Sequence, residues 1–152
     1  MSSRQESLGF LLADVSRLMR QAFSQRLEGS ALTLAQARAL IYVSRNEGLR
    51  QVELADMLEI QPISLARLID QLADAGLVER RPDPADRRAY QLFLKPAATA
   101  ELAAIEAVTA SIRRDALAGI AKPQADAVLA ALKTMRANLA ALPRRPTKEI
   151  SQ

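Results

Sequence analysis

Three polar side chains recur at steps of three and four residues within the segment 62–75. Ser64, Arg67 and Gln71 would share the exposed face of a helix there, because the apolar side chains of the segment fall on the opposite face. An exposed arginine can donate hydrogen bonds to a guanine edge or to a phosphate, and the residues leave both open. The alternative is a solvated helix face that binds nothing.

A second charged cluster, Asp86, Arg87 and Arg88, ends a stretch that is rich in proline and aspartate. Such a stretch favours a turn. The segments 77–81 and 88–94 on either side read as strands, the second because its side chains alternate in polarity. We therefore expect a hairpin with a long exposed tip. Its arginines either contact an anionic partner or are simply solvated.

Arg80 and Arg81 are weaker candidates for contacts with a partner. Arginines on strands often pair with nearby acids, and Asp83 is the expected acid here.

The 152 residues include no cysteine and no histidine. Disulfides, thiol chemistry, a histidine general base, a serine–histidine–aspartate triad and histidine-based zinc sites are therefore excluded. The sequence also shows no paired-carboxylate or phosphate-loop motif. We expect no enzymatic activity, no cofactor and no metal.

Signals for membranes or export are missing as well. No apolar run approaches the ~18–20 residues that span a bilayer. The first ten residues are too polar for a signal peptide. The sequence therefore predicts a cytoplasmic protein that does not bind a membrane.

The composition favours helices. Hydrophobic residues make up 49% of the chain and aromatic ones 3%, while alanine and leucine together account for 52 of the 152 residues. Both residues enter helices at low cost. The net charge is +4, but residues 33–95 carry nine basic and nine acidic groups. Bulk charge is thus a poor indicator of a nucleic-acid partner, which must be argued from the positions of individual arginines.

Apolar residues recur with helical period in six segments. Thr33 and Gln36 form a capping box before the second segment, Pro62 suits the first position of the fourth, and Gly76 suits its end. In the last two segments the apolar residues recur about every 3.5 residues, which suits long helices that pack against each other. The expected helices span residues 5–27, 34–45, 51–58, 62–75, 97–118 and 123–142.

The central elements form one unit. A short helix, a tight turn, a second helix and a hairpin follow one another between residues 51 and 94. This is the order of a winged helix-turn-helix, whose second helix can lie in the DNA major groove while the wing reaches the minor groove. The predicted fold class is mainly α with a small β-hairpin wing. The N- and C-terminal helices would form a dimer, because one chain cannot obviously cover their apolar seams.

Five motifs stand out in order and spacing: Leu32-Thr33, Val52-Glu53-Leu54-Ala55, residues 60–72, Gly76-Leu77-Val78-Glu79-Arg80 and Asp86-Arg87-Arg88. With them the chain resembles, over residues 8–142, the MarR family of bacterial transcription regulators, particularly its SlyA-like members. The resemblance implies a triangular homodimer on a near-palindromic operator, with its recognition helices about one DNA turn apart. It also implies an N-terminal dimerisation helix (1–31), a DNA-binding lobe (32–95) and C-terminal dimerisation helices (96–143). Pro143 ends the last helix, and we expect a disordered tail at 144–152.

The resemblance implies roles for individual residues. Ser64 and Arg67 match positions in the major groove, and Arg87 lies at the wing tip, where the narrow minor groove of A·T-rich DNA attracts arginine. Asp86 would orient an arginine, and Arg88 would contact the DNA backbone or support the loop. The expected DNA-binding residues are Thr33, Arg50, Gln51, Gln61, Pro62, Ile63, Ser64, Arg67, Gln71, Asp86, Arg87 and Arg88.

Two helix starts, at Thr33 and Gln51, suit phosphate binding because helix N-termini attract anions. Capping alone would explain Thr33 equally well. Two positions depart from the family pattern, since Gln61 and Arg50 stand where hydroxyl caps are common. Arg50 would contact a phosphate instead.

Many members of this family release DNA when a small aromatic acid or another lipophilic anion binds between the dimer helices and the winged lobe. Leu11, Arg17, Leu40 and Tyr42 are the expected lining of such a site, because an apolar pocket with one cation suits a carboxylate. Alternatively, Arg17 forms only a salt bridge. Sensing by thiol oxidation is excluded, because the chain has no cysteine.

The sequence thus predicts a transcription regulator, a repressor or an activator, that binds double-stranded DNA as a homodimer. A small effector such as an aromatic carboxylate would release it. The alternative is a winged-helix protein–protein interaction module without sequence-specific DNA binding, which the neutral charge of residues 33–95 favours.

Overall fold

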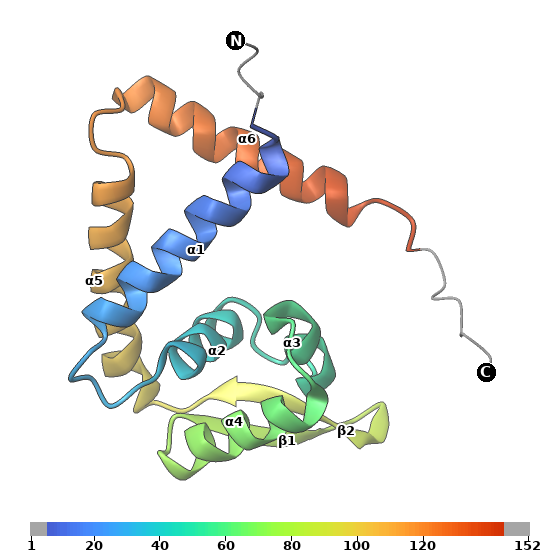
Figure 1. Cartoon of the computed structure of the whole chain (residues 1–152). Coiled ribbons are helices and arrows are strands. Elements are labelled where there is room, and N and C mark those ends of the chain that lie inside the picture. Colours follow the sequence, from blue (N-terminus) through green and yellow to red (C-terminus); the bar gives the residue numbers. More distant parts are fainter. Residues whose placement is uncertain (1–5, 145–152) are drawn as a thin grey trace, which may run out of the picture. The chain divides into compact units, whose positions relative to one another are not determined.

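The computed structural model of the chain describes residues 6–144, so the tail predicted at 144–152 lies outside them from residue 145 on. Six helices and one two-stranded antiparallel sheet lie within the described residues (Figure 1). The predicted class, mainly α with a small β-hairpin wing, is confirmed. The elements are α1 (Leu8–Arg26), α2 (Leu34–Arg45), α3 (Gln51–Leu58), α4 (Pro62–Asp74), β1 (Val78–Asp83), β2 (Asp86–Leu94), α5 (Ala98–Ala116) and α6 (Lys122–Ala140).

Two compact units make up the chain, divided after Ala116. The first unit holds α1 to α5 and the hairpin around one hydrophobic core. Within it, α2, α3, α4 and the hairpin lie together in the lower part of Figure 1, and α5 packs against both α1 and α2. The second unit holds α6. None of the helices within residues 6–144 is long and apolar enough to cross a membrane.

The core of the first unit forms because α2, α3, α4 and α5 each turn apolar side chains inward, while α1 adds Phe23 near its end. α4 buries Leu65, Leu68, Ile69 and Leu72, the positions that its helical period predicts. Burying a side chain of this size stabilises the fold by about 1.5–3 kcal/mol. The largest fully buried side chains are Leu40, Leu54, Leu65, Ile69, Leu72, Leu92, Ile105, Val43 and Val78. Burial of one face fixes the opposite face of α4 towards solvent.

The capping box predicted before α2 is present. The Thr33 hydroxyl accepts a hydrogen bond from the Gln36 amide at 3.2 Å, and the Gln36 side-chain oxygen accepts one from the Thr33 amide at 2.9 Å. Two amides that the helix itself leaves without partners are thereby satisfied.

Thr33→Ala is therefore expected to lower the free energy of unfolding by about 1 kcal/mol, the usual cost of losing a helix cap. Urea denaturation followed by circular dichroism measures it. Thr33→Ser keeps the hydroxyl and should retain most of the stability. Equal stability of the alanine and serine variants would show that the hydroxyl does not stabilise α2.

A three-residue turn joins α3 to α4. Its first residue, Glu59, adopts a left-handed conformation with φ 55°, which is uncommon for a residue other than glycine. The Ile60 amide then donates to the Ala55 carbonyl at 3.1 Å and closes the end of α3. Pro62 occupies the first turn of α4, where a missing N–H is tolerated. Neither Arg50 nor Gln61 forms a side-chain cap, as their departure from hydroxyl residues predicts.

The hairpin differs from the predicted one. Its strands reach Asp83 and Asp86, which pair, so the long exposed tip is wrong and only two residues form the turn. Pro82 pairs with Tyr90, and the register shifts between the two pairs. Residues 87–89 of β2 therefore bulge and face no residue of β1. A bulge of this kind turns side chains away from the regular pleat.

Candidate nucleic-acid interface

The exposed face of α4 begins with polar side chains that have no hydrogen-bonding or ionic partner elsewhere in residues 6–144. Ser64 and Arg67 are exposed, and neither side chain forms a hydrogen bond or an ion pair with the described residues. Gln61, Pro62 and Ile63 are exposed at the start of the helix. The first two turns of α4 therefore present unpaired hydrogen-bonding groups to solvent.

Further along α4, Asp70 and Gln71 differ because their side chains have partners within the protein. The Asp70 carboxylate pairs with Arg80 at 2.7 Å, and the Gln71 side-chain oxygen accepts from Gln36 at 3.1 Å. The Ala66 carbonyl also accepts from Arg80, at 3.0 Å. Of the three polar positions predicted on this face, Gln71 is thus held by α2, while Ser64 and Arg67 are not held.

Arg80 connects three elements. From β1 it reaches Asp70 and the Ala66 carbonyl on α4, and its Nε donates to the Gln51 side-chain oxygen on α3 at 2.9 Å. The predicted pairing with Asp83 is wrong for this arginine, because the fold brings Asp70, the Ala66 carbonyl and Gln51 to it instead. The side-chain oxygen of Gln51, a predicted phosphate contact, is thus engaged by Arg80.

Arg81 is also occupied. It pairs with Glu79 at 2.5 Å and lies 3.9 Å from the centre of the Phe93 ring, a cation–π contact. The structure therefore leaves neither Arg80 nor Arg81 unpaired.

Asp83 is the acid that closes the hairpin. Only 6% of it is exposed; its carboxylate accepts from the Ala85 amide at 2.8 Å and pairs with Arg50 at 2.8 Å. The Ala85 hydrogen bond and then Arg50 hold the pKa of Asp83 below its ordinary value, although burial acts in the opposite direction. Arg50, a predicted phosphate contact, instead ties the start of α3 to the wing, with 40% of its side chain still exposed.

Asp83→Asn is expected to remove a stabilisation that depends on pH. Because folding lowers the pKa of Asp83 below its ordinary 3.8, the folded state favours the carboxylate. This contribution is complete above about pH 5 and is lost as the pH falls through the lowered folded pKa. The difference in unfolding free energy between wild type and Asp83→Asn, measured in urea across the acid range, should shrink towards low pH. Arg50→Gln should remove part of this pH dependence. A difference that stays constant would contradict the assignment.

The hairpin presents the remaining predicted arginines. Arg87 and Arg88 are exposed in the bulge of β2, and their side chains form no hydrogen bond or ion pair with residues 6–144. Asp86 accepts a hydrogen bond from the Arg88 amide at 3.0 Å, which holds the backbone of the bulge. The expectation that Asp86 orients an arginine side chain stays a prediction, because this contact is with the backbone of Arg88.

Two groups of unpaired side chains therefore belong to one lobe, with the first turns of α4 as one and the bulge of β2 as the other. Guanidinium, hydroxyl and amide groups are the donors that proteins direct at phosphates and base edges. The hydroxyl of Thr33, by contrast, already accepts the hydrogen bond of the capping box.

None of the four residues predicted to line an effector site lines the pocket between α2 and α5 that is described below. Arg17 lies 3.6 Å from Asp14 on the same helix, which matches the salt-bridge alternative. Leu11 is exposed, Tyr42 is half-buried, and Leu40 has no exposed surface.

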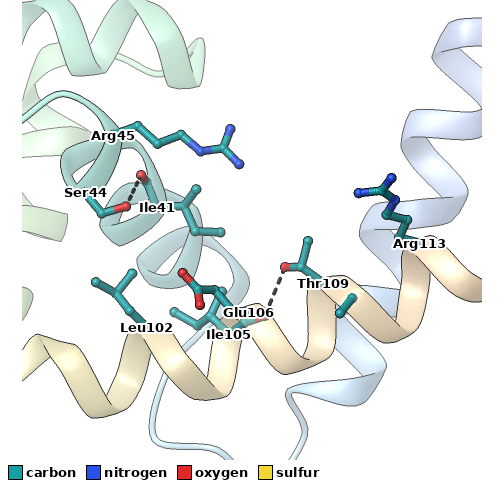
Figure 2. A pocket seen from close by; sticks show the side chains of 9 residues that line it. Ile41, Ser44, Arg45, Leu102, Ile105, Glu106, Thr109 and Arg113 are labelled. Atoms are coloured by element: carbon teal, nitrogen blue, oxygen red, sulfur yellow. Dashed lines mark hydrogen bonds between the residues drawn. The ribbon is translucent and has the colours of Figure 1, made fainter. Parts of the chain in front are cut away.

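A pocket of about 340 Å³ lies instead between α2 and α5 (Figure 2). Arg45 and Arg113 project towards it from the two helices, and Glu106 lies beside Ile105 on α5. No pattern in the sequence predicts this pocket, because its residues come from two helices that are distant along the chain. Its lining residues are Ile41, Ser44, Arg45, Leu102, Ile105, Glu106, Thr109, Ala110 and Arg113.

Comparisons with known proteins agree with this architecture. A model of the MarR family matches residues 32–89, from the end of the α1–α2 connection to the bulge. A solved transcriptional regulator, PA3341, is 36% identical over 90% of this chain and 100% of its own, with a TM-score of 0.75.

At lower identity the fold is shared. A structure of MarR is 23% identical over 92% of this chain and 95% of its own, with a TM-score of 0.81. A MarR transcriptional regulator from Methanosarcina mazei Go1 is 24% identical over 86% and 94%, with a TM-score of 0.76. Together with the winged lobe described above, these matches establish that the chain belongs to the MarR family, whose members are transcription regulators.

Proposed function

We propose that this protein binds double-stranded DNA sequence-specifically, as a homodimer on a near-palindromic operator. One observation carries the proposal. In a lobe where Arg50, Arg80 and Arg81 all have protein partners, Arg67 and the arginine pair of the bulge have none among residues 6–144. Unpaired arginines on a helix and on a wing suit the major and minor grooves respectively.

The dimer is supported by apolar surface on the terminal helices. Along α1, Leu8, Leu11, Val15 and Leu18 are each between 45% and 60% exposed. In the second unit, Val128, Leu132, Leu139 and Leu142 are between 37% and 68% exposed. Apolar surface of this extent marks an interface, and a two-fold dimer would set two α4 helices about one DNA turn apart.

Binding to labelled duplexes from the DNA upstream of the protein's own gene tests the proposal. Fluorescence anisotropy at increasing salt should give a linear fall of log K with log salt concentration, with a slope of about −5 for six phosphate contacts. Unlabelled duplex of unrelated sequence should compete poorly. Failure to bind any of these duplexes would refute the proposal.

A protein–protein interaction module is the second candidate. The nine acidic groups that balance nine basic ones in residues 33–95 favour it. An association through this lobe that does not weaken with salt, in a protein that ignores duplex DNA, would establish it instead.

We further propose that a small lipophilic anion binds the pocket between α2 and α5 and releases DNA. The pocket has an apolar floor from Ile41, Leu102 and Ile105, and two guanidinium groups against one carboxylate. Its volume lies in the range that small ligands occupy.

The probe is 2-naphthoate, with the uncharged 2-naphthamide as its matched control. The acid should raise the thermal midpoint and weaken DNA binding, and Arg45→Gln with Arg113→Gln should abolish both effects. Equal responses to the acid and the amide would contradict recognition of an anion.

A further inference from the structure

Ile63 is a large apolar side chain in the first turn of α4, on the face that the helix turns to solvent. It is 67% exposed, more than any other large apolar side chain of the lobe formed by α2, α3, α4 and the hairpin. Arg67 follows it four residues later, so the two side chains lie one above the other on the same strip of the helix. The core-facing side of α4 is complete without Ile63, since Leu65, Leu68, Ile69 and Leu72 fill it.

From this placement we infer that Ile63 reads thymine, by packing against the 5-methyl group in the major groove. The inference rests on the proposed function, since it needs α4 to enter that groove. Thymine is the base that presents an apolar group there, whereas the other major-groove edges offer donors and acceptors. An isoleucine packed against one of these polar edges would displace water from the donors and acceptors without replacing its hydrogen bonds.

The neighbours of Ile63 strengthen the assignment. Pro62 before it has no amide hydrogen to offer, so the helix start presents an apolar pair. Ser64 and Arg67, which follow it on the helix, carry unpaired donors that suit phosphate and guanine. Side chains four residues apart on a helix are about 6 Å apart, which corresponds to about two base-pair steps of DNA. Each half-site would thus hold a thymine about two steps from the base pair that Arg67 contacts.

The test replaces single thymines by deoxyuridine within the two half-sites of the operator. Deoxyuridine differs from thymidine only in lacking the 5-methyl group. We expect one thymine per half-site whose replacement weakens binding of the full-length protein about three- to fourfold, and about tenfold when both half-sites are changed. Ile63→Ala should bind the natural operator correspondingly more weakly and no longer distinguish thymine from deoxyuridine at that position.

Val52→Ala is the matched control, because Val52 is a 59% exposed apolar residue on α3 rather than α4. This variant should keep the full response to deoxyuridine. If wild type binds the operator but no single replacement weakens it, or if Ile63→Ala keeps the full response, the inference is wrong while DNA binding stands. If wild type binds no duplex, the proposed function fails with it.

Discussion

Leu18→Glu is expected to convert the proposed dimer into monomers and to abolish tight operator binding. Leu18 is 54% exposed on the apolar stripe of α1, so the monomer accepts a carboxylate there without strain. In a two-fold interface the same carboxylate is buried twice, and each copy loses at least ~1.4 kcal/mol. The dissociation constant of the dimer should therefore rise about 100-fold or more, which sedimentation velocity measures.

Ser24→Glu is the control for this variant. It adds the same charge to α1, but six residues after Leu18, on the polar side of the helix, where Ser24 is exposed. It should remain a dimer and bind the operator normally. Should Leu18→Glu still sediment as a dimer, α1 does not contribute its apolar stripe to the interface.

Arg87→Ala is expected to weaken operator binding about tenfold or more per dimer, with the dimer itself unchanged. The side chain lies in the bulge of β2, has no partner among the described residues, and is the strongest candidate for the minor groove. Its loss removes a cation at the groove from each copy without disturbing a contact inside the protein. Anisotropy at fixed salt measures the affinity.

Arg114→Ala provides the matched loss of charge at an exposed arginine on α5, outside the winged lobe. Its operator affinity should stay within about twofold of wild type. Unchanged binding by Arg87→Ala would remove the wing from the mechanism and leave recognition to α4.

Much of the fold is predictable because its determinants are local. The buried positions of α4 follow from a 3.6-residue period, and its ends follow from Pro62 and from Gly76, which adopts a positive φ of 74°. The capping box of Thr33 and Gln36 is a contact across three residues. Such features depend on residues that are close together in the sequence, so the sequence alone predicts them.

The errors arise where the partner is distant in sequence. Asp83 closes the hairpin with Arg50, 33 residues away, so the composition of the tip alone suggests a longer loop. Arg80 chooses Asp70 and Gln51 because the fold brings α3 and α4 to β1. The pocket between α2 and α5 likewise combines Arg45 with Arg113, and no local pattern marks the two as neighbours.

The sequence shows where the arginines of the lobe lie along the chain, but it does not show which of them have partners within the protein. The sequence contains five arginines between residues 67 and 88. Only the three-dimensional arrangement separates Arg80 and Arg81, which have partners, from Arg67, Arg87 and Arg88, which do not.

The three contacts of Arg80 have a thermodynamic consequence. They join β1 to α3 and α4 in the free protein. For the proposed DNA binding, α4 and the hairpin are therefore preorganised, and the conformational entropy of aligning them is lost during folding rather than during association. In the proposed complex, the duplex would immobilise only the side chains that touch it. The winged lobe, whose residues 33–95 have no net charge, would therefore retain most of the free energy of its few contacts as affinity.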